Sequence, residues 1–323
     1  MSLVLQTFPM PDPVVEKLQA QHEVTQALFV EGRALIKAAS GVRGVVAGTE
    51  PWSREVIEAV GPELEVISRV GTGVDSVDLK AATEHGIAVL NAPGENAQTI
   101  AELSVGLMWG LSRRIVEADR AVRTTGFLMR TEMDGLELWG KTVGVVGFGE
   151  IGRRVAAICQ HGFGMSVLVT TAHPDPERLE SAGVDAIFVE LDALLDRADF
   201  VALHAAVNPQ TERMIGEIEL KAMKPSAYLI NTSRGQLVDE NALASALSDG
   251  DIAGYGADVF DVEPPPADHP LFSFPNTILT PHYGSGTYEA MTRMSDRAVT
   301  NLIECLAGER PARTVNPEIY ERR

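Results

Sequence analysis

The sequence predicts an α/β protein with two doubly wound parallel-sheet domains. Short apolar segments alternate with amphipathic helical segments along most of the chain, the order from which a parallel sheet covered by helices is built. A glycine-rich turn at residues 147–152 joins one apolar segment to the helical segment that follows it. The 323 residues, 45% of them hydrophobic, suffice for two domains with separate cores.

The first 96 residues contain five candidate strands separated by helical segments such as Asp12–Gln21 and Ser53–Val60. We expect a smaller, flavodoxin-like domain here. The amphipathic segment Tyr288–Leu306 follows the last candidate strand of the chain, and we expect it to return to this domain. The predicted domain is therefore discontinuous and contains residues 1–96 and 288–323. Its candidate strands are Leu3–Leu5, Val24–Leu28, Val42–Ala47, Val66–Val70 and Ala88–Leu90.

The loop after Val66–Val70 reads GTGVDSVDL and begins with Gly71 and Gly73. Open α/β sheets bind ligands at the carboxyl ends of their strands. Accessible N–H groups in this loop would suit a carboxylate. The structural alternative is an ordinary tight loop in which Asp75 or Asp78 caps the next helix.

Asn96–Thr124 is predicted to form one long helix, because apolar residues such as Leu103, Leu107 and Leu111 recur at helical spacing. The helix is apolar on more than one face and must be buried on several sides. Either the core of the protein or a second subunit could cover it.

The central motif is KTVGVVGFGEIGRRVAA, from Lys141 to Ala157. A β-branched apolar strand precedes Gly147, Gly149 and Gly152, and a helical pattern follows them. In this context Gly147 permits the tight turn, Gly149 lets the backbone approach a pyrophosphate, and Gly152 lets the helix pack close to the sheet. The N–H groups of the first helical turn would face the phosphates.

Residues 97–287 are therefore predicted to form a Rossmann-type dinucleotide-binding domain. Helical segments separate most of its later strands, as in a sheet with two mononucleotide-binding halves. These strands are Ser166–Thr170, Ala186–Val189, Phe200–His204, Tyr228–Asn231, Ile252–Ala257 and Thr277–Thr280.

The residue expected to select NAD is unusual. A domain of this kind normally has Asp or Glu at the end of its second strand, where the carboxylate binds the ribose hydroxyls and repels a 2′-phosphate. Here that position is Thr171, which can bind a hydroxyl but cannot repel phosphate. No Arg or Lys follows at once, and only His173 is near. NAD is favoured, and NADP is not excluded.

Three side chains at later strand ends could perform chemistry. Arg234 offers a planar charged fork that matches a carboxylate. His282 titrates near neutrality, as a proton donor and acceptor for an alcohol–carbonyl pair should. Glu263 could orient that imidazole. Singly, each could instead be an incidental surface or loop residue.

Taken together, the chain resembles the D-isomer-specific 2-hydroxyacid dehydrogenase family, especially its phosphoglycerate, glyoxylate and hydroxypyruvate reductase-like members. The resemblance covers nearly the whole chain. It rests on RVGTGVDSVDL, GKTVGVVGFGEIGRR, LINTSRGQLVDENAL, GADVFDVEPPP and TPHYGS.

The resemblance implies an enzyme that moves a hydride between NAD(P) and a small D-2-hydroxy acid or 2-oxo acid. Arg234 would hold the substrate carboxylate, His282 would act as acid and base, and Glu263 would support His282. Val70 and Gly71 would donate backbone N–H groups to the carboxylate, which makes the discontinuous domain the substrate domain. The implied cofactor contacts are Thr72, Gly147, Gly149, Glu150, Ile151, Gly152, Thr171, Thr232 and Asp258. The family also implies a homodimer formed through a helix like Asn96–Thr124.

Composition limits the partners. The formal net charge of −18 argues against nucleic acid and anionic membranes, because both require basic patches. The two cysteines, Cys159 and Cys305, give neither a disulfide framework nor a metal cluster, so no residue is assigned to a metal and a reducing cytoplasm is favoured. The N-terminal residues lack the basic region of a secretory signal, and no apolar run is long enough to span a bilayer.

Two other functions remain open. A dinucleotide-sensing binding protein, similar to the C-terminal-binding-protein corepressors, could keep the same three residues without turnover. A related enzyme could oxidise a non-carboxylate anion such as phosphite.

Overall fold

The computed structural model describes residues 1–124 and 134–321, which form two compact units. The first unit contains the chain up to Asn96 and again from Ser285 onward, and the second contains Ala97–Gly284. Within the described ranges, no helix is both long enough and apolar enough to cross a membrane.

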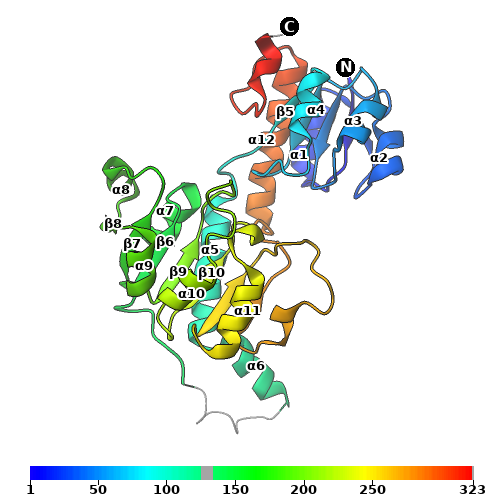
Figure 1. Cartoon of the computed structure of the whole chain (residues 1–323). Coiled ribbons are helices and arrows are strands. Elements are labelled where there is room, and N and C mark those ends of the chain that lie inside the picture. The colour runs from blue at the N-terminus through cyan, green and yellow to red at the C-terminus, as the bar shows by residue number, and fades with distance from the viewer. Residues whose placement is uncertain (125–133, 322–323) are drawn as a thin grey trace. The chain divides into compact units, whose positions relative to one another are not determined.

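The first unit contains a five-stranded parallel sheet in the order β2-β1-β3-β4-β5, the flavodoxin-like order of a doubly wound sheet. Figure 1 draws most of this unit in blue and cyan, with the orange helix α12 from the last part of the chain. The helix α12 packs on β3 and β4 beside α1, and its buried residues belong to one of the two cores of this unit. The strands are β1 (Leu3–Gln6), β2 (Glu23–Gln26), β3 (Gly44–Ala47), β4 (Val66–Arg69) and β5 (Ala88–Leu90); the helices are α1 (Asp12–Gln19), α2 (Gly32–Ala39), α3 (Arg54–Val60), α4 (Leu79–Glu84) and α12 (Tyr288–Leu306).

The second unit contains a seven-stranded parallel sheet in the order β12-β11-β10-β9-β6-β7-β8. Its first strand, β6, lies between β9 and β7, so the strand order reverses there, as in a Rossmann-type sheet. The strands are β6 (Thr142–Val146), β7 (Ser166–Thr170), β8 (Ala186–Phe188), β9 (Phe200–Leu203), β10 (Tyr228–Asn231), β11 (Gly254–Ala257) and β12 (Thr277–Leu279). The predicted fold class, with two parallel α/β sheets, is confirmed.

Helices cover both faces of this second sheet. On one face α5 and α7 contribute to a core that includes Met108 and Val155, and Cys159 is buried in it as a small apolar residue. On the other face α9, α10 and α11 build a second core around residues such as Leu194 and Leu243. The helices are α5 (Ala97–Ser112), α6 (Ile115–Thr124), α7 (Glu150–Ala157), α8 (Pro176–Ala182), α9 (Leu191–Arg197), α10 (Glu217–Ala222) and α11 (Glu240–Asp249).

Side-chain caps mark several helix starts. The Asp78 carboxylate accepts a hydrogen bond from the Ala81 N–H at 2.8 Å and begins α4, which confirms the capping alternative for that residue. Thr287 accepts from the Ala290 N–H at 3.2 Å, so α12 begins at Tyr288, as predicted. Such caps satisfy N–H groups that have no partner inside the helix.

The prediction of one helix over Asn96–Thr124 is wrong. The chain leaves the helical conformation after Ser112, and Arg114 adopts a φ of +51°, which an α-helix does not permit. A new helix, α6, begins at Ile115, and the Arg114 guanidinium pairs with Glu117 in its first turn at 2.5 Å. The apolar spacing continues across the break, so periodicity alone did not reveal it.

Candidate active site

The glycine turn has the steric form that its motif predicts. Gly147 has a φ of +95°, and a Cβ on it would lie 2.6 Å from the backbone carbonyl of His204 on the neighbouring strand end. A Cβ on Gly152 would lie 2.1 Å from the Gly147 carbonyl oxygen. Nothing lies within 4 Å of a Cβ built on Gly149, so the space above this residue is open. The turn therefore allows the protein backbone to lie close to a ligand group such as a pyrophosphate.

The helix α7 begins at Glu150, directly after Gly149, and no side chain caps its first N–H groups. The Glu150 carboxylate is turned toward its own helix, where it pairs with Arg153 and, at 2.7 Å, with Arg154. The Arg154 hydrogen bond and the charges of both arginines lower the pKa of Glu150. The charge of Glu150 is thus balanced locally, and the helix start stays favourable for an anion.

Thr171 follows β7 directly, at the carboxyl edge of the sheet. The neighbouring Thr170 hydroxyl donates to the Val189 carbonyl at 2.7 Å and ties the ends of β7 and β8 together. The predicted contact residue therefore stands on a fixed strand end. The following residues, Ala172–Pro174, contain no Arg or Lys that could bind a 2′-phosphate.

Arg234 stands in a loop that its own neighbours hold in shape. The Asn231 amide donates to the Arg234 carbonyl at 2.8 Å and accepts from the Ser233 N–H at 3.1 Å. The hydroxyl of Ser233 donates to the Ala205 carbonyl at 2.7 Å, and Thr232 shares a 2.6 Å hydrogen bond with Ser104 of α5. The guanidinium is thereby presented from the carboxyl end of β10.

His282 and Glu263 form a direct pair. The Nδ1 atom of His282 lies 2.5 Å from Oε2 of Glu263, so Nδ1 carries the hydrogen and Nε2 is the ring atom left for a substrate. The other carboxylate oxygen accepts from the Phe260 N–H at 3.0 Å. Half of the His282 side chain is exposed.

The charges around Glu263 keep it ionised. Partial burial raises the pKa of Glu263, but hydrogen bonds from His282 and the Phe260 N–H, with the positive charges of His282 and Arg234, lower it more. The net pKa lies below the usual range of a glutamate. Since Arg234 acts on Glu263, the structure brings the three predicted catalytic side chains together at the ends of the adjacent strands β10, β11 and β12.

Asp258 was predicted to contact the cofactor, and the structure shows that its buried carboxylate already organises the His282 loop. It accepts hydrogen bonds from the Thr280 hydroxyl at 2.6 Å and from the Tyr283 and Gly284 N–H groups at 3.0 and 2.7 Å. His282, within this loop, has a φ of +50°. The sequence carried no signal for this role.

The prediction for Val70 needs correction. Its N–H donates to the Ala47 carbonyl at 2.8 Å, because the pairing of β3 and β4 continues one residue past the strand, so it cannot bind a substrate carboxylate. The Gly71 N–H is directed to the Arg69 carbonyl at 3.0 Å. The next two amides of this loop belong to Thr72 and Gly73.

The loop around Thr72 is held from the first unit itself. The Thr72 hydroxyl donates to the Asn96 side chain at 3.2 Å, and the Asn91 side chain donates to the Thr72 carbonyl at 2.7 Å. Within the described part of the chain, the N–H groups of Thr72 and Gly73 donate to no protein acceptor.

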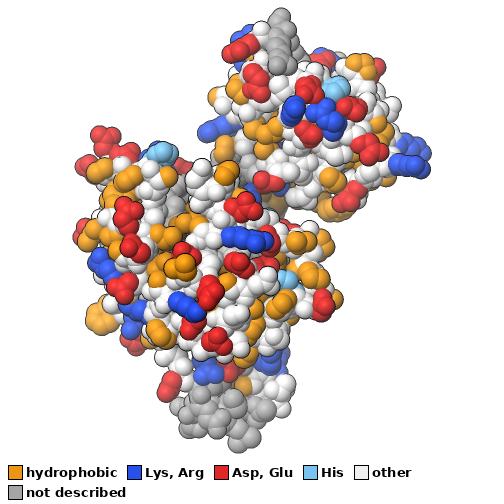
Figure 2. All heavy atoms as spheres, in the orientation of Figure 1, with side chains coloured by type: hydrophobic (Ala, Val, Ile, Leu, Met, Phe, Trp, Pro, Cys, Tyr) orange, Lys and Arg blue, Asp and Glu red, His pale blue; other side chains and the backbone are white. Residues whose placement is uncertain are grey.

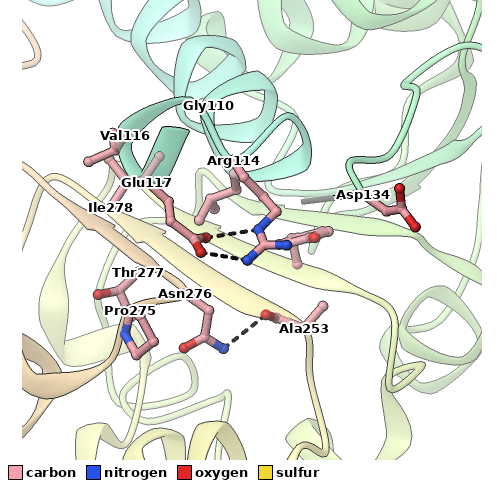
Figure 3. Close-up of a pocket in the computed structure, with 12 residues that line it drawn as sticks. Gly110, Arg114, Val116, Glu117, Asp134, Ala253, Pro275, Asn276, Thr277 and Ile278 are labelled. Carbon is pink, nitrogen blue, oxygen red and sulfur yellow. Dashed lines mark hydrogen bonds and ion pairs between the residues drawn. The ribbon is translucent and has the colours of Figure 1, made fainter. Parts of the chain in front are cut away.

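A cavity of about 330 Å³ lies at the opposite, amino-terminal edge of the second sheet, next to α5 and α6 (Figure 3). Arg114 is directed across it and is paired with Glu117, while Asn276 donates to the Ala253 carbonyl at 2.9 Å. None of the predicted site residues lines this cavity.

Comparison with known proteins shows which proteins this chain is similar to. Residues 105–284 match the profile described as "D-isomer specific 2-hydroxyacid dehydrogenase, NAD binding domain". A glyoxylate reductase of Korarchaeum cryptofilum is 41% identical over 276 residues, 84% of this chain and 82% of that protein.

Solved structures agree with this match. The TT0316 protein of Thermus thermophilus superposes with a TM-score of 0.87 and 37% identity, covering 97% of this chain and 99% of the other. A glyoxylate reductase from Paecilomyes thermophila gives a TM-score of 0.85 at 29% identity, with 97% and 98% covered.

Proposed function

The chain belongs to the D-isomer-specific 2-hydroxyacid dehydrogenase family, and on this premise we propose that it reduces small 2-oxo acids to 2-hydroxy acids, and catalyses the reverse reaction, with a nicotinamide cofactor. The observation that carries the proposal is the 2.5 Å contact between His282 and Glu263, with Arg234 acting on the same carboxylate. A guanidinium, an imidazole and a supporting carboxylate are the groups that this reaction requires.

In this mechanism Arg234 binds the substrate carboxylate and polarises the adjacent carbonyl. Nε2 of His282 gives a proton to the carbonyl oxygen in reduction and removes it from the hydroxyl in oxidation. Glu263 keeps the imidazole oriented through its contact with Nδ1. The nicotinamide, when bound, supplies or accepts the hydride.

Residues of this chain that would hold the cofactor are those of the glycine turn, with Glu150 and Ile151 at the start of α7 and with Thr171, Thr232 and Asp258. The open space above Gly149 fits this role. We propose NAD as the preferred cofactor, because no Arg or Lys immediately follows Thr171 to bind a 2′-phosphate. NADP is not excluded, because Thr171 carries no charge that would repel it.

For the substrate carboxylate we propose the N–H groups of Thr72 and Gly73 in place of those of Val70 and Gly71. They follow one another in a loop held by Asn91 and Asn96, and within the described residues they donate to no protein acceptor. The first unit would then be the substrate domain.

We further propose a homodimer in the cytoplasm, acting on a small anion and not on nucleic acid or a membrane. On the face shown in Figure 2, acidic side chains lie among Lys and Arg side chains over both units. The helix α6 has no buried residue, and Ile115, Val116 and Val122 are exposed on it, so a second subunit would cover apolar surface. Light scattering of the purified protein tests this directly.

The enzymatic proposal is tested by following absorbance of the reduced nicotinamide, with NADH and NADPH each crossed with glyoxylate, hydroxypyruvate, pyruvate and longer 2-oxo acids. His282→Ala should lose about 10²–10⁴-fold in kcat. Arg234→Ala should lose mainly kcat/KM for the 2-oxo acid, because the fork that matches the carboxylate is gone. Both should bind NADH, measured by fluorescence, as the unaltered protein does.

Two results would contradict the proposal. Cofactor binding without turnover of any 2-oxo acid would favour a dinucleotide-sensing protein. Phosphite-dependent reduction of the cofactor would identify a different substrate class.

A further inference from the structure

A second histidine–carboxylate pair lies beneath the loop that carries Glu263. Nε2 of His269 is 3.0 Å from Oε2 of Glu240, the first residue of α11, and the two side chains are only 8% and 16% exposed. The Leu271 N–H is directed to Nδ1 of His269 at 3.4 Å, so Nε2 is the ring nitrogen that carries the hydrogen. The mechanism described above gives neither residue a role.

Both Glu240 and His269 contact the loop that carries Glu263. The free oxygen of Glu240 accepts from the Asp261 N–H at 3.1 Å. The ring of His269 meets the Phe260 ring edge-on, with centroids 5.6 Å apart and planes at 78°. Phe260 and Asp261 are therefore held on two sides, one by a charged hydrogen bond and one by ring packing.

The same two residues are fixed from the Arg234 loop. Gln236 donates from its side-chain amide to the Asp261 carbonyl at 2.7 Å. Gly235 lies so close that a Cβ on it would be 1.9 Å from the Phe260 carbonyl carbon. The Phe260–Asp261 peptide is thus enclosed between the chain after Arg234 and the Glu240–His269 pair.

Phe260 links this fixed peptide to the proposed acid–base pair, His282 and Glu263. The Phe260 N–H binds one oxygen of Glu263 at 3.0 Å, and the other oxygen binds His282 at 2.5 Å. A small rotation of Phe260 would release the first oxygen and let the carboxylate turn away from the imidazole. Displacements of about 1 Å at a reacting group can cost about a hundredfold in rate.

We propose that Glu240 and His269 are positioning residues for the acid–base pair: they fix Phe260 and Asp261 so that the Phe260 N–H holds Glu263 against His282. This inference rests on the proposed function, in which His282 moves the proton. The charged and titratable neighbours are His282 and Arg234 around Glu263, Tyr255 near Glu240, and Arg213 at 4.0 Å from Asp261.

The test compares His269→Leu with His269→Gln in the full-length protein. A glutamine places an N–H donor near the position of Nε2 and can keep the bond to Glu240, whereas leucine fills the space without a donor. Glu240→Gln is a second variant, because its amide has a single acceptor for two donors. Asp268→Asn, at the adjacent exposed residue, is the control.

We expect His269→Leu to lower kcat about tenfold to a hundredfold while KM for NADH stays within about twofold. The acid limb of the kcat profile should move to higher pH, because Glu263 loses a hydrogen bond that lowers its pKa. His269→Gln should restore most of the rate and the original limb, Glu240→Gln should lie between the two, and Asp268→Asn should match the unaltered protein.

A second readout does not depend on turnover. In ¹³C-histidine-labelled protein, the ring resonance of His282, identified by its loss in His282→Gln, senses protonation of Glu263 as a low-pH inflection. That inflection should move to higher pH in His269→Leu and return in His269→Gln. An unmoved inflection, with native circular dichroism, would overturn the positioning role. A moved inflection with unchanged turnover would instead count against the proposed role of His282.

Discussion

The Gly284 N–H donates to Oδ2 of Asp258 at 2.7 Å, and this bond joins the end of β11 to the loop that follows β12. Thr280 and Tyr283 bind the other oxygen of the same carboxylate, so residues on both sides of His282 are anchored to one buried acid. The positive φ of His282 is maintained by this anchoring, since an isolated histidine rarely adopts it.

Asp258→Asn should therefore lower kcat by about tenfold to a hundredfold through a loosened His282 loop. The amide keeps one acceptor oxygen and turns an N–H₂ group toward donors that previously faced a carboxylate. Steady-state kinetics with a saturating 2-oxo acid measure the effect, and Asp249→Asn on the exposed end of α11 is the control. Equal kcat values in the two variants would contradict the anchoring role.

The lowered pKa of Glu263 has a consequence for the pH profile. A carboxylate whose pKa is depressed in the folded protein keeps its charge as the pH falls. It loses that charge only below the ordinary glutamate pKa of about 4.3. Activity should therefore persist on the acid side to a lower pH than an ordinary carboxylate would allow.

Glu263→Gln should remove this acid limb and reduce kcat, because the amide keeps a neutral acceptor near His282 but no charge. Profiles of kcat between about pH 3 and pH 8 measure both effects. An acid limb that survives unchanged in Glu263→Gln would show that another group is responsible for it.

His204 provides a separate test, on stability. Its two ring nitrogens are buried and have no hydrogen-bond partner among the described residues, and burial lowers the pKa of His204 to about 4. In the unfolded chain the imidazole binds a proton near its ordinary pKa of about 6.5. Below that pH the unfolded state gains protons that the folded state does not, so stability is lost as the pH falls from about 6.5 toward about 4.

At pH 5 this single group should cost about 2 kcal/mol relative to neutral pH. His204→Leu should remove that part of the acid sensitivity, whereas His173→Leu, at an exposed position, should not. Urea unfolding at pH 7 and pH 5 gives the comparison. An identical pH dependence in His204→Leu and the unaltered protein would mean that His204 binds a proton in the folded state as readily as in the unfolded chain.

Much of the fold followed from local pattern. The helix Tyr288–Leu306 has the predicted bounds, because a Thr cap and an amphipathic repeat are both local features. The break before α6 did not follow, since it depends on a non-glycine residue, Arg114, at positive φ. Nothing in the composition of that segment distinguishes it from a continuous helix.

The site likewise contains residues that the sequence reveals and contacts that only the folded structure reveals. Arg234, Glu263 and His282 could be selected because their chemistry and their positions at strand ends are visible in the sequence. The hydrogen bond from the Val70 N–H to the Ala47 carbonyl could not be predicted, because it depends on how two strands pair that are distant in the sequence. The supporting roles of Asp258 and His269 were equally hidden, since their partners are backbone N–H groups and side chains brought near only by folding.

Two separate constraints act on Gly71: its positive φ and the nearby Arg69 side chain. Its φ is +148°, and a Cβ on it would lie 1.5 Å from Nη1 of Arg69, whose guanidinium folds back to donate to the Val70 carbonyl at 2.5 Å. Gly71→Ala should destabilise the protein by about 1–3 kcal/mol and raise KM for the 2-oxo acid, because the Thr72–Gly73 amides move with the displaced loop.

Two further variants separate the constraints. Gly86 has a φ of +72°, and a Cβ on it would meet nothing within 4 Å, so Gly86→Ala reports backbone strain alone. In an Arg69→Ala background the clash at Gly71 disappears, and Gly71→Ala should then keep only its backbone strain, which exceeds that of Gly86→Ala because a φ of +148° lies outside the left-handed helical region. A Gly71→Ala penalty that stays unchanged when Arg69 is truncated would show that the guanidinium adds nothing to the cost of the substitution.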